Sequence, residues 1–436
     1  MHNNRIILHS DCNSFYASVE CHLNPDLRNL PVAVCGNADD RHGIILAKND
    51  IAKKFGVRTG EAIWQAQKKC PNLVNVRAKY EHYIDYSKRI RDIYSDYTDL
   101  IEPFGLDEAW LDITGSRNIF GNSVTIAKEI KNRIKNEIGI TVSIGLSYNK
   151  IFAKLGSDYK KPDALTIISP HNFKKIVWPL DCSELFYVGS ATKRKLYSLG
   201  IYTIGDIAQM EQSVLVHHFG IWGSRLHVFS NGLDTSSVSP YSYCPPPKSI
   251  GNSTTTHRDL CTIEDVKIIF SVLTDSVCRR MREQNLRCKT IAIQVRDNSL
   301  TTITRQKTLN SVTNLTHDIL NACLELFSKN YNLKTMRAIR SLSVNISDLV
   351  PTELGVQLSL FENIENSTLN DTKLESLDNT CDSLKNRFGN FAITSAIMLK
   401  DKKLSQFNPK DDHIIHPVGF RVGWVFSRKI GRQTPT

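Results

Sequence analysis

The sequence predicts an α+β protein of several domains, and three observations support this prediction. The chain has 436 residues, which is more than one ordinary domain contains. In residues 5–165, apolar runs with the two-residue period of strands alternate with runs at helical spacing. A polar stretch rich in Pro and Ser, residues 232–247, then precedes a second region of the same kind, residues 248–350. We therefore expect at least two separate mixed sheets.

Composition indicates a polyanionic partner and a reducing compartment. The chain carries 55 Lys and Arg against 44 Asp and Glu, a net charge of +11, and its pI is about 9.0. Its 11 cysteines include no Cys-X-X-Cys pair, which argues against a disulfide framework and against a zinc site. The sequence shows neither a signal peptide nor a membrane-spanning apolar run. We expect a soluble, cytoplasmic protein with no membrane partner.

The first predicted strand, residues 6–11, ends in a carboxylate, and a helix follows it. Ile6, Ile7 and Leu8 are apolar, whereas Asp11 closes the run. Core packing explains such an acid poorly, because burying an unpaired charge costs free energy. Asp11 is therefore a candidate functional residue.

Two more strands and a helix are predicted in the next segment. The strands are residues 31–36 and 44–47, with a polar loop, 37–43, between them. Residues 48–56 have the pattern of a helix that ends at Gly56.

A pair of adjacent carboxylates, Asp107 and Glu108, follows a turn that contains Pro103 and Gly105. The alternating run after the pair, residues 109–114, predicts a strand. A pair of this kind, taken alone, is most often a solvated acidic turn. Together with an acid at the end of a neighbouring strand, it would hold two Mg²⁺ ions, because hard cations prefer oxygen ligands on a rigid backbone.

The pattern continues with helices at residues 79–100 and 126–138, the second ended by Gly139, and a strand at 141–146. The order strand, helix, paired strands, helix, strand is that of a ferredoxin-like sheet with helices on one side. Residues 166–231 read as short helices separated by glycine turns.

Three motifs, in the segments 10–20, 105–114 and 147–162, together resemble one protein family. Their sequence, order and spacing are similar to those of the Y-family, translesion DNA polymerases, among them bacterial polymerase IV and the catalytic subunit of polymerase V. The resemblance extends from about residue 5 to about residue 350. It implies a right-hand polymerase with a ferredoxin-like palm, small fingers, a helical thumb with a helix-hairpin-helix, and an α+β little finger.

The resemblance also implies where each domain begins and ends. The palm is expected in two parts, and the other domains follow in chain order. The expected ranges are 1–28 and 79–165 for the palm, 29–78 for the fingers, 166–231 for the thumb, 232–247 for a linker, 248–350 for the little finger and 351–436 for a C-terminal tail. The little finger has 15 Lys and Arg against 9 Asp and Glu, a charge that favours salt-dependent DNA binding.

The family's functional residues can be carried over to matching positions. The expected catalytic set consists of the three acids, which also bind two Mg²⁺ ions together with Cys12. Tyr16 is expected to be a steric gate that leaves no room for a ribose 2′-hydroxyl, with Phe15 beside it in the same site or in the core. The expected contacts to the triphosphate are Lys53 and Lys161, although the neighbouring Lys160 fits the motif almost as well.

Three positions depart from the family pattern. A tyrosine and an arginine that usually touch the phosphates are matched by Asp50 and Lys53, and Lys53 keeps the charge without the bidentate fork of arginine. Tyr187 replaces the first glycine of the helix-hairpin-helix. We expect phosphate contacts to differ at these positions, and Asp50 and Lys53 are closer to polymerase V-like members.

The last segment contains a peptide that resembles the sliding-clamp motif of bacterial replication proteins. Its expected anchor residues are Gln357, Leu358, Leu360 and Phe361. A helical apolar stripe follows, which is expected to pack against the protein, and it consists of Leu374, Leu377, Cys381, Leu384 and Phe388.

These observations predict an error-prone, template-directed DNA polymerase that transfers a nucleotide from a dNTP to a primer 3′-hydroxyl. Its expected partners are primer-template DNA, dNTP and the sliding clamp, and it is expected to be monomeric. One alternative is a non-catalytic accessory protein that binds DNA and the clamp. Another is a nucleotide cyclase, which can use a similar sheet with two acids but does not need a basic little finger.

Overall fold

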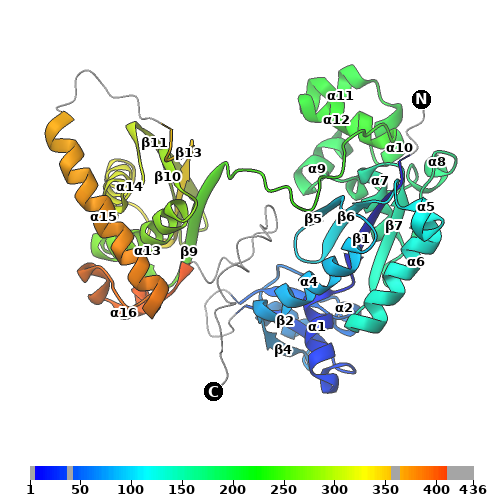
Figure 1. Ribbon diagram of the computed structural model, residues 1–436, viewed down its shortest axis with the longest axis horizontal. Coiled ribbons are helices and arrows are strands. Elements are labelled where there is room, and N and C mark those ends of the chain that lie inside the picture. The colour runs from blue at the N-terminus through cyan, green and yellow to red at the C-terminus, as the bar shows by residue number, and fades with distance from the viewer. Residues whose placement is uncertain (1–4, 37–42, 355–363, 410–436) are drawn as a thin grey trace. The chain divides into compact units, whose positions relative to one another are not determined.

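A computed structural model describes residues 5–36, 43–354 and 364–409 of the chain (Figure 1). These residues form two compact units, the first up to Cys244 and the second from Pro245 onward. Among them, none of the helices has the length and apolar character needed to cross a membrane.

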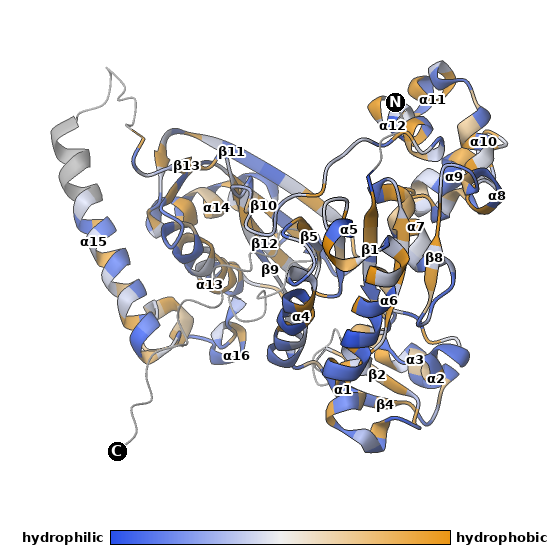
Figure 2. Cartoon of the chain, turned by 45° about the vertical axis from the view of Figure 1, so that its right-hand side comes forward, coloured by the Kyte–Doolittle hydropathy of each residue, from blue (hydrophilic) through white to orange (hydrophobic). Residues whose placement is uncertain are grey.

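The first unit is built on a five-stranded mixed sheet. The strand order is β5 (Ile101–Phe104), β6 (Glu108–Asp112), β1 (Ile7–Cys12), β7 (Val142–Ser147) and β8 (Leu165–Ile167). β1 lies at the centre, pairs antiparallel with both of its neighbours, and is buried along its whole length. Figure 2 shows that apolar residues are frequent in the strands of this sheet, although β1 also buries His9, Ser10 and Asp11.

Helices cover both faces of this sheet, whereas the sequence predicted cover on one side only. The helices are α1 (Phe15–Leu23), α4 (Tyr80–Ser95), α5 (Arg117–Phe120), α6 (Ser123–Arg133) and α7 (Lys150–Tyr159). The Tyr94 hydroxyl on α4 donates to Ser10 Oγ on one face of β1. On the other face α7 lies directly on β7, because a Cβ on Gly145 would come within 1.9 Å of the Ala153 carbonyl oxygen. The correction concerns α7, whose short apolar sequence did not reveal which face it covers.

A small three-stranded sheet lies between the two parts of the large one in sequence. Its order is β3 (Ile45–Lys48), β2 (Val32–Cys35) and β4 (Val74–Arg77), and its helices are α2 (Asp50–Lys54) and α3 (Ile63–Lys69). The Asn49 side chain caps α2 by accepting from the Ala52 N–H at 3.0 Å. Gly56, with φ +78°, ends this helical segment as predicted.

Short helices form the rest of the first unit. They are α8 (Phe173–Ile176), α9 (Ser190–Ser198), α10 (Ile204–Gln209), α11 (Gln212–Phe219) and α12 (Ile221–Ser230). Their core also contains Phe152 of α7, so α7 joins this helical part to the large sheet. Tyr187 has φ +72°, a backbone conformation that favours glycine, and its side chain is exposed.

The second unit is a four-stranded antiparallel sheet with two helices on one face. The strand order is β11 (Thr302–Thr313), β10 (Leu286–Asp297), β12 (Ile339–Ser347) and β9 (Ser249–Leu260), and β13 (Val350–Pro351) also pairs with β10. α13 (Ile263–Arg282) and α14 (Thr316–Asn330) pack on the apolar face. The Thr262 side chain caps α13 by accepting from the Asp265 N–H. Polar residues line the open face, among them Gln294, Arg296, Ser341, Ser343 and Asn345.

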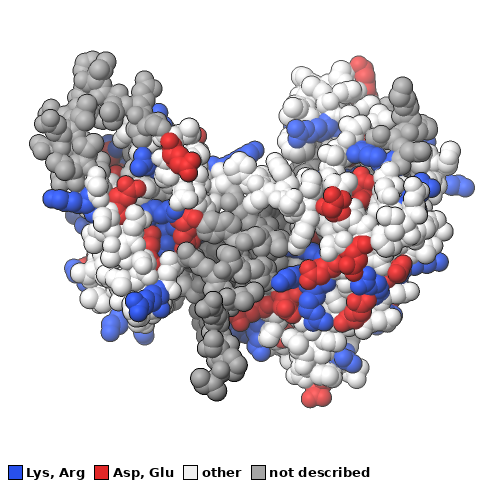
Figure 3. Space-filling view, viewed as in Figure 1, with Lys and Arg blue, Asp and Glu red and all other residues white. Residues whose placement is uncertain are grey.

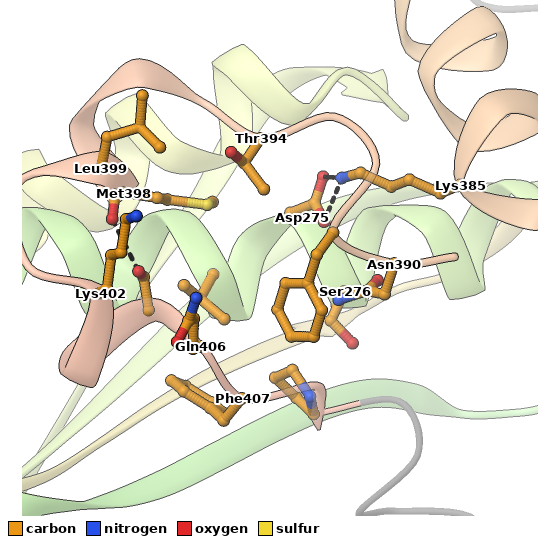
Figure 4. A pocket seen from close by; sticks show the side chains of 14 residues that line it. Asp275, Ser276, Lys385, Asn390, Thr394, Met398, Leu399, Lys402, Gln406 and Phe407 are labelled. Carbon is orange, nitrogen blue, oxygen red and sulfur yellow. Dashed lines mark hydrogen bonds and ion pairs between the residues drawn. The ribbon is translucent and has the colours of Figure 1, made fainter. Parts of the chain in front are cut away.

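Part of the C-terminal segment packs on this second unit. α15 (Ile364–Phe388), the 3₁₀ turn Ala396–Leu399 and α16 (Lys402–Ser405) lie against α13, and Leu404 belongs to the apolar core. A cavity of about 210 Å³ remains between α13 and these elements, with the Lys385–Asp275 ion pair at its wall (Figure 4). The clamp-like peptide lies outside the described residues.

One local prediction was wrong. Pro103 lies in β5 and not in a turn, so the turn consists of residues 105–107 only. β5 is an edge strand of the sheet, where proline is tolerated because one side of the strand needs no hydrogen-bond partner.

Candidate active site

The three candidate acids meet at one end of two paired strands. Asp11 near the end of β1 is opposite Glu108, the first residue of β6, in the antiparallel register. Asp107 precedes Glu108 in the turn, and its backbone carbonyl accepts from the Cys12 N–H at 2.9 Å. Strand pairing therefore brings together residues that are almost one hundred positions apart in sequence.

Helix α4 holds the turn that carries Asp107. The Arg91 guanidinium, which is buried, donates to the Gly105 carbonyl at 2.8 Å, and the Ser87 hydroxyl donates to the Leu106 carbonyl. Gly105 has φ +80°, so the tight connection from β5 to β6 uses the conformational freedom of glycine. The carboxylate is thus attached to a backbone fixed on both sides.

Two lysines bind the acids directly. Lys161 Nζ lies 2.7 Å from Asp11 Oδ2 and 2.6 Å from Asp158 Oδ1. Lys154 forms an ion pair with Glu108, and its Nζ lies 3.8 Å from Asp158 Oδ2. Asp158 on α7 is therefore within reach of both ammonium groups. Lys160, the alternative to Lys161, instead lies over the ring of Tyr159.

Burial, and then the charges of the neighbouring acids, raise the pKa values of Asp11 and Asp107. Burial and then the Glu108 charge raise the pKa of Asp11 from 3.8 to about 6, although Lys161 opposes this. Burial, Glu108 and Asp11 raise the pKa of Asp107 from 3.8 to about 7. The Lys161 pKa is above its ordinary value, because Asp11 and Asp158 outweigh the lowering effect of burial. The site therefore favours the binding of protons or cations, which offset the negative charge of the acids.

The carboxylates of the site are suitable ligands for hard divalent ions. In the structure, lysines form ion pairs with two of them. No three His, Cys, Asp or Glu side chains of the described residues are gathered closely enough to enclose a metal ion. The available donors are carboxylate oxygens, which Mg²⁺ prefers. Burial raises the pKa of the Cys12 thiol well above its ordinary value. On the face of the first unit seen in Figure 3, acidic side chains gather with basic ones beside them.

His9 lies behind the acids and was not predicted. Its ring is fully buried, Nδ1 is 2.7 Å from Ser157 Oγ and Nε2 is 3.3 Å from Glu108 Oε2. Burial and then Lys154 lower its pKa to about 3, so the ring is neutral. Ser157 has a single hydroxyl proton, which goes either to His9 Nδ1 or to the Lys154 carbonyl. When the proton goes to His9, Nε2 carries the ring proton, and this nitrogen lies near Glu108 without forming a hydrogen bond to a described residue.

Tyr16 and Phe15 occupy the first turn of α1 with different surroundings. The Tyr16 ring stacks on Tyr83, with centroids 4.2 Å apart and an angle of 11°, and its side chain is half-buried. The Asp107 charge contributes to a raised Tyr16 pKa, after burial, which places the phenol near the acids. Phe15 is 3% exposed and is a core residue.

The two residues of α2 that differ from the family pattern do not lie in the acid cluster. Asp50 and Lys53 are exposed, and Lys53 forms no ion pair with a described residue. Among the predicted site residues that the structure describes, Lys53 and the core residue Phe15 have no contact with the three acids.

Sequence reasoning missed His9 and Asp158 and assigned no role to Lys154. A usable signal existed for each. His9 is two residues before Asp11, which places both on the same face of a strand. Lys154 and Asp158 are four residues apart, which places both on one side of a helix. Only the docking of α7 on β1 shows that these faces meet.

Two family models match the chain. The impB/mucB/samB family matches residues 10–158, and its C-terminal domain matches residues 247–360. The DNA polymerase IV of Acetivibrio thermocellus is 47% identical over 402 residues, which are 92% of this chain and 99% of that protein. The DNA polymerase IV of Moorella thermoacetica is 38% identical over 90% of this chain and 96% of its own. DNA polymerase IV 2 of Bacillus subtilis is 37% identical over 92% of this chain and 96% of its own.

Among solved structures, a Y-family DNA polymerase chimera has the same fold. It aligns with a TM-score of 0.69 at 24% identity, over 79% of this chain and 99% of that chain. The chain belongs to the Y family of DNA polymerases. The prediction of a DNA-directed DNA polymerase is confirmed, and the cyclase and the non-catalytic accessory protein are set aside. Y-family polymerases use divalent metal ions, in agreement with the donor set described above.

The raised pKa of Asp107 predicts a pH-dependent stability of the metal-free protein. The folded state keeps a proton that the unfolded chain releases above about pH 4, so the free energy of unfolding falls as the pH rises towards about 7. Asp107→Asn removes this effect. In EDTA at about pH 8 we expect the variant to be more stable than the wild type, by on the order of 1–4 kcal/mol. At about pH 4 the advantage should be absent.

Urea unfolding at the two pH values measures this difference. Asp85→Asn is the matched control, because Asp85 is an exposed carboxylate on α4. An equal effect of both substitutions, or an Asp107→Asn variant that is less stable at about pH 8, would contradict the predicted charge excess.

Proposed function

We propose that this protein is a translesion DNA polymerase in which Asp11, Asp107 and Glu108 bind two Mg²⁺ ions at the end of β1 and β6. The observation that carries the proposal is the meeting of three carboxylates at the end of two paired strands, where the pKa values of Asp11 and Asp107 are raised. Cys12 would contribute its backbone oxygen. When bound, the ions would activate the primer 3′-hydroxyl and neutralise charge on the triphosphate.

The two lysines would exchange partners when substrate binds. Lys161 is an ammonium group within reach of both Asp11 and Asp158, so it can leave the metal-binding carboxylate without losing all of its ion pairs. It would then bind the triphosphate as a point charge. Lys154 would turn from Glu108 towards Asp158 in the same way. His9 would hold Glu108 by donating from Nε2.

We infer the right-hand division of the family for this chain. The large sheet would be the palm, 1–28 and 79–165, and the small sheet would be the fingers, 29–78. The helical part, 166–231, would be the thumb, followed by the linker 232–247 and the little finger 248–350. The strand order and the packed helices described above support this division, with β8 extending the palm sheet to Ile167. The exposed Lys53 would contact the triphosphate from the fingers.

DNA would bind to two surfaces, and the binding at both would not depend on the base sequence. The open face of the second sheet is polar and carries Arg296, and the unit that contains it has an excess of basic residues. The turn before α9 would offer backbone N–H groups to a phosphate as in a helix-hairpin-helix. Tyr187 keeps the positive φ of the missing glycine there, so the turn is formed although the exposed ring occupies space. We expect the protein to be monomeric and to copy DNA with low fidelity.

The acid cluster predicts the outcome of a primer-extension experiment. Asp107→Asn or Glu108→Gln should lower extension more than about 100-fold, because even residues that only orient metal ligands contribute 10–100-fold. Both variants should still bind primer-template DNA in a gel-shift assay. Asp85→Asn on the exposed face of α4 should extend like the wild type. Substantial extension by either variant would overturn the two-metal proposal.

Tyr16 predicts the choice between ribo- and deoxyribonucleotides. Tyr16→Ala should raise the efficiency of rNTP incorporation relative to dNTP by at least about tenfold, because the ring no longer excludes the 2′-hydroxyl. The measurement is single-nucleotide insertion kinetics with each substrate. Tyr202→Ala, which removes an exposed tyrosine of the helical part, is the control. Unchanged selectivity in Tyr16→Ala would mean that another residue forms the gate.

The peptide at residues 357–361 predicts binding to a bacterial sliding clamp, with Gln357, Leu358, Leu360 and Phe361 as anchors. Leu360→Ala combined with Phe361→Ala should abolish clamp binding in surface plasmon resonance and leave clamp-free extension unchanged. Clamp binding at wild-type strength by this double variant would refute the assignment.

A further inference from the structure

Helix α15 carries an apolar repeat that the proposed polymerase function does not use. Leu374, Leu377, Cys381, Leu384 and Phe388 follow one another at spacings of three and four residues, the spacing of a coiled-coil seam. The sequence predicted that this stripe packs against the protein. The structure shows a different arrangement.

The side of α15 that packs on α13 is charged. Arg282 of α13 binds two acids of α15, with Nη1 3.0 Å from Asp378 Oδ2 and Nε 2.8 Å from Asp382 Oδ2. Lys385 Nζ lies 2.6 Å from Asp275 Oδ1 of α13. Arg282, Asp382 and Lys385 are buried by this contact. Ion pairs and not apolar side chains therefore hold this part of α15 in place.

The apolar stripe faces solvent instead. The exposed fractions are 57% for Leu377, 37% for Leu384 and 61% for Phe388. Figure 2 shows apolar residues recurring along the described part of this helix. Removing such side chains from water is favourable, so three exposed apolar side chains along one side of the helix form a substantial unused interaction surface. The earlier expectation is thus wrong for these three residues.

The heptad positions show which flank of the seam is open. With Leu374, Cys381 and Phe388 at position a, the e positions are Asp378 and Lys385, which α13 already binds. The g positions lie on the other flank. They are Lys373, Thr380 and Arg387, all exposed, and the Arg387 guanidinium lies 4.9 Å from the centre of the Phe388 ring. A partner helix would therefore meet an apolar seam bordered by two basic groups.

This charge pattern disfavours a second copy of the chain. In an antiparallel pair of α15 helices the g positions face each other, so Lys373 would meet Arg387 of the other copy, and like charges repel. In a parallel pair each g position faces an e position, and α13 covers that flank. The chain's own segment 410–436 is also a poor match, because it carries Pro417, Gly419, Gly423, Arg421, Arg428, Lys429 and Arg432.

We propose that α15 is a docking surface for an amphipathic helix of another protein. That helix has apolar residues at three- and four-residue spacing and Asp or Glu along the edge that faces Lys373 and Arg387. Its apolar side chains cover Leu377, Leu384 and Phe388, and its acids pair with the basic flank. This is the helix-on-helix mode of recognition, with α13 acting as the fixed neighbour that keeps α15 in place.

The test uses the full chain and a synthetic probe. The probe is a fluorescent peptide of three heptads, with Leu at a and d and Glu at e and g, and fluorescence anisotropy measures its binding. We expect saturable binding to the wild type. Binding should be at least about tenfold weaker for a peptide with Lys at e and g, and for a peptide of the same composition in scrambled order. The scrambled peptide controls for general attraction between an acidic peptide and a basic protein.

Substitutions on the chain separate the seam from the flank. Leu377→Asn with Leu384→Asn should lower affinity at least about tenfold, while the thermal midpoint and primer extension stay unchanged, because these side chains are exposed. Leu399→Asn, which alters an exposed leucine beside the cavity, is the matched control. Lys373→Glu with Arg387→Glu should reverse the preference between the Glu and Lys peptides.

Several results would overturn the proposal. They are no binding of the Glu peptide, equal binding of the scrambled peptide, or equal binding by the seam variant. Sedimentation showing a dimer that the seam variant abolishes would assign the surface to a second copy. Limited proteolysis showing residues 410–436 protected in the wild type and cleaved in the seam variant would assign it to the chain's own end.

Discussion

The antiparallel register of β1 with β6 is the constraint on which the site depends. It places Asp11 opposite Glu108 and brings Asp107 to the same strand ends, so three carboxylates share a small, partly buried volume. Burial and then the charges of the neighbouring acids raise the pKa values of Asp11 and Asp107, and the strand that carries Asp11 is buried along its whole length. A one-residue slip would turn Glu108 to the opposite face and separate the acids.

Helix α7 completes the site because it lies unusually close to the sheet. Gly145 on β7 leaves no room for a side chain, which lets the α7 backbone approach and places Ser157 next to His9. The same helix presents Lys154 and Asp158 towards the acids, and the chain after it presents Lys161. Close packing and electrostatics are therefore coupled here, since the glycine contact sets where the neutralising lysines can reach.

In the second unit, the core is apolar but one helix is attached by ion pairs. Its sheet and two helices form an ordinary apolar core, but α15 is attached mainly through Arg282, Asp275 and their partners. Buried ion pairs contribute little net stability and are geometrically demanding, so they orient the helix more than they stabilise it. The consequence is that the apolar side of the helix stays available.

The sequence by itself determined the strands and helices with strong periodicity, the acids at strand ends, the helix end at Gly56, and the family. These features are local, because alternation, capping residues and short motifs act over a few residues. Tertiary structure decided that α7 covers the second face of the sheet, that Pro103 is in an edge strand and that His9 lies beside Glu108. It also decided which side of α15 faces solvent. The physical reason is that an amphipathic or charged face does not specify its partner, so contacts between distant segments depend on how whole elements pack.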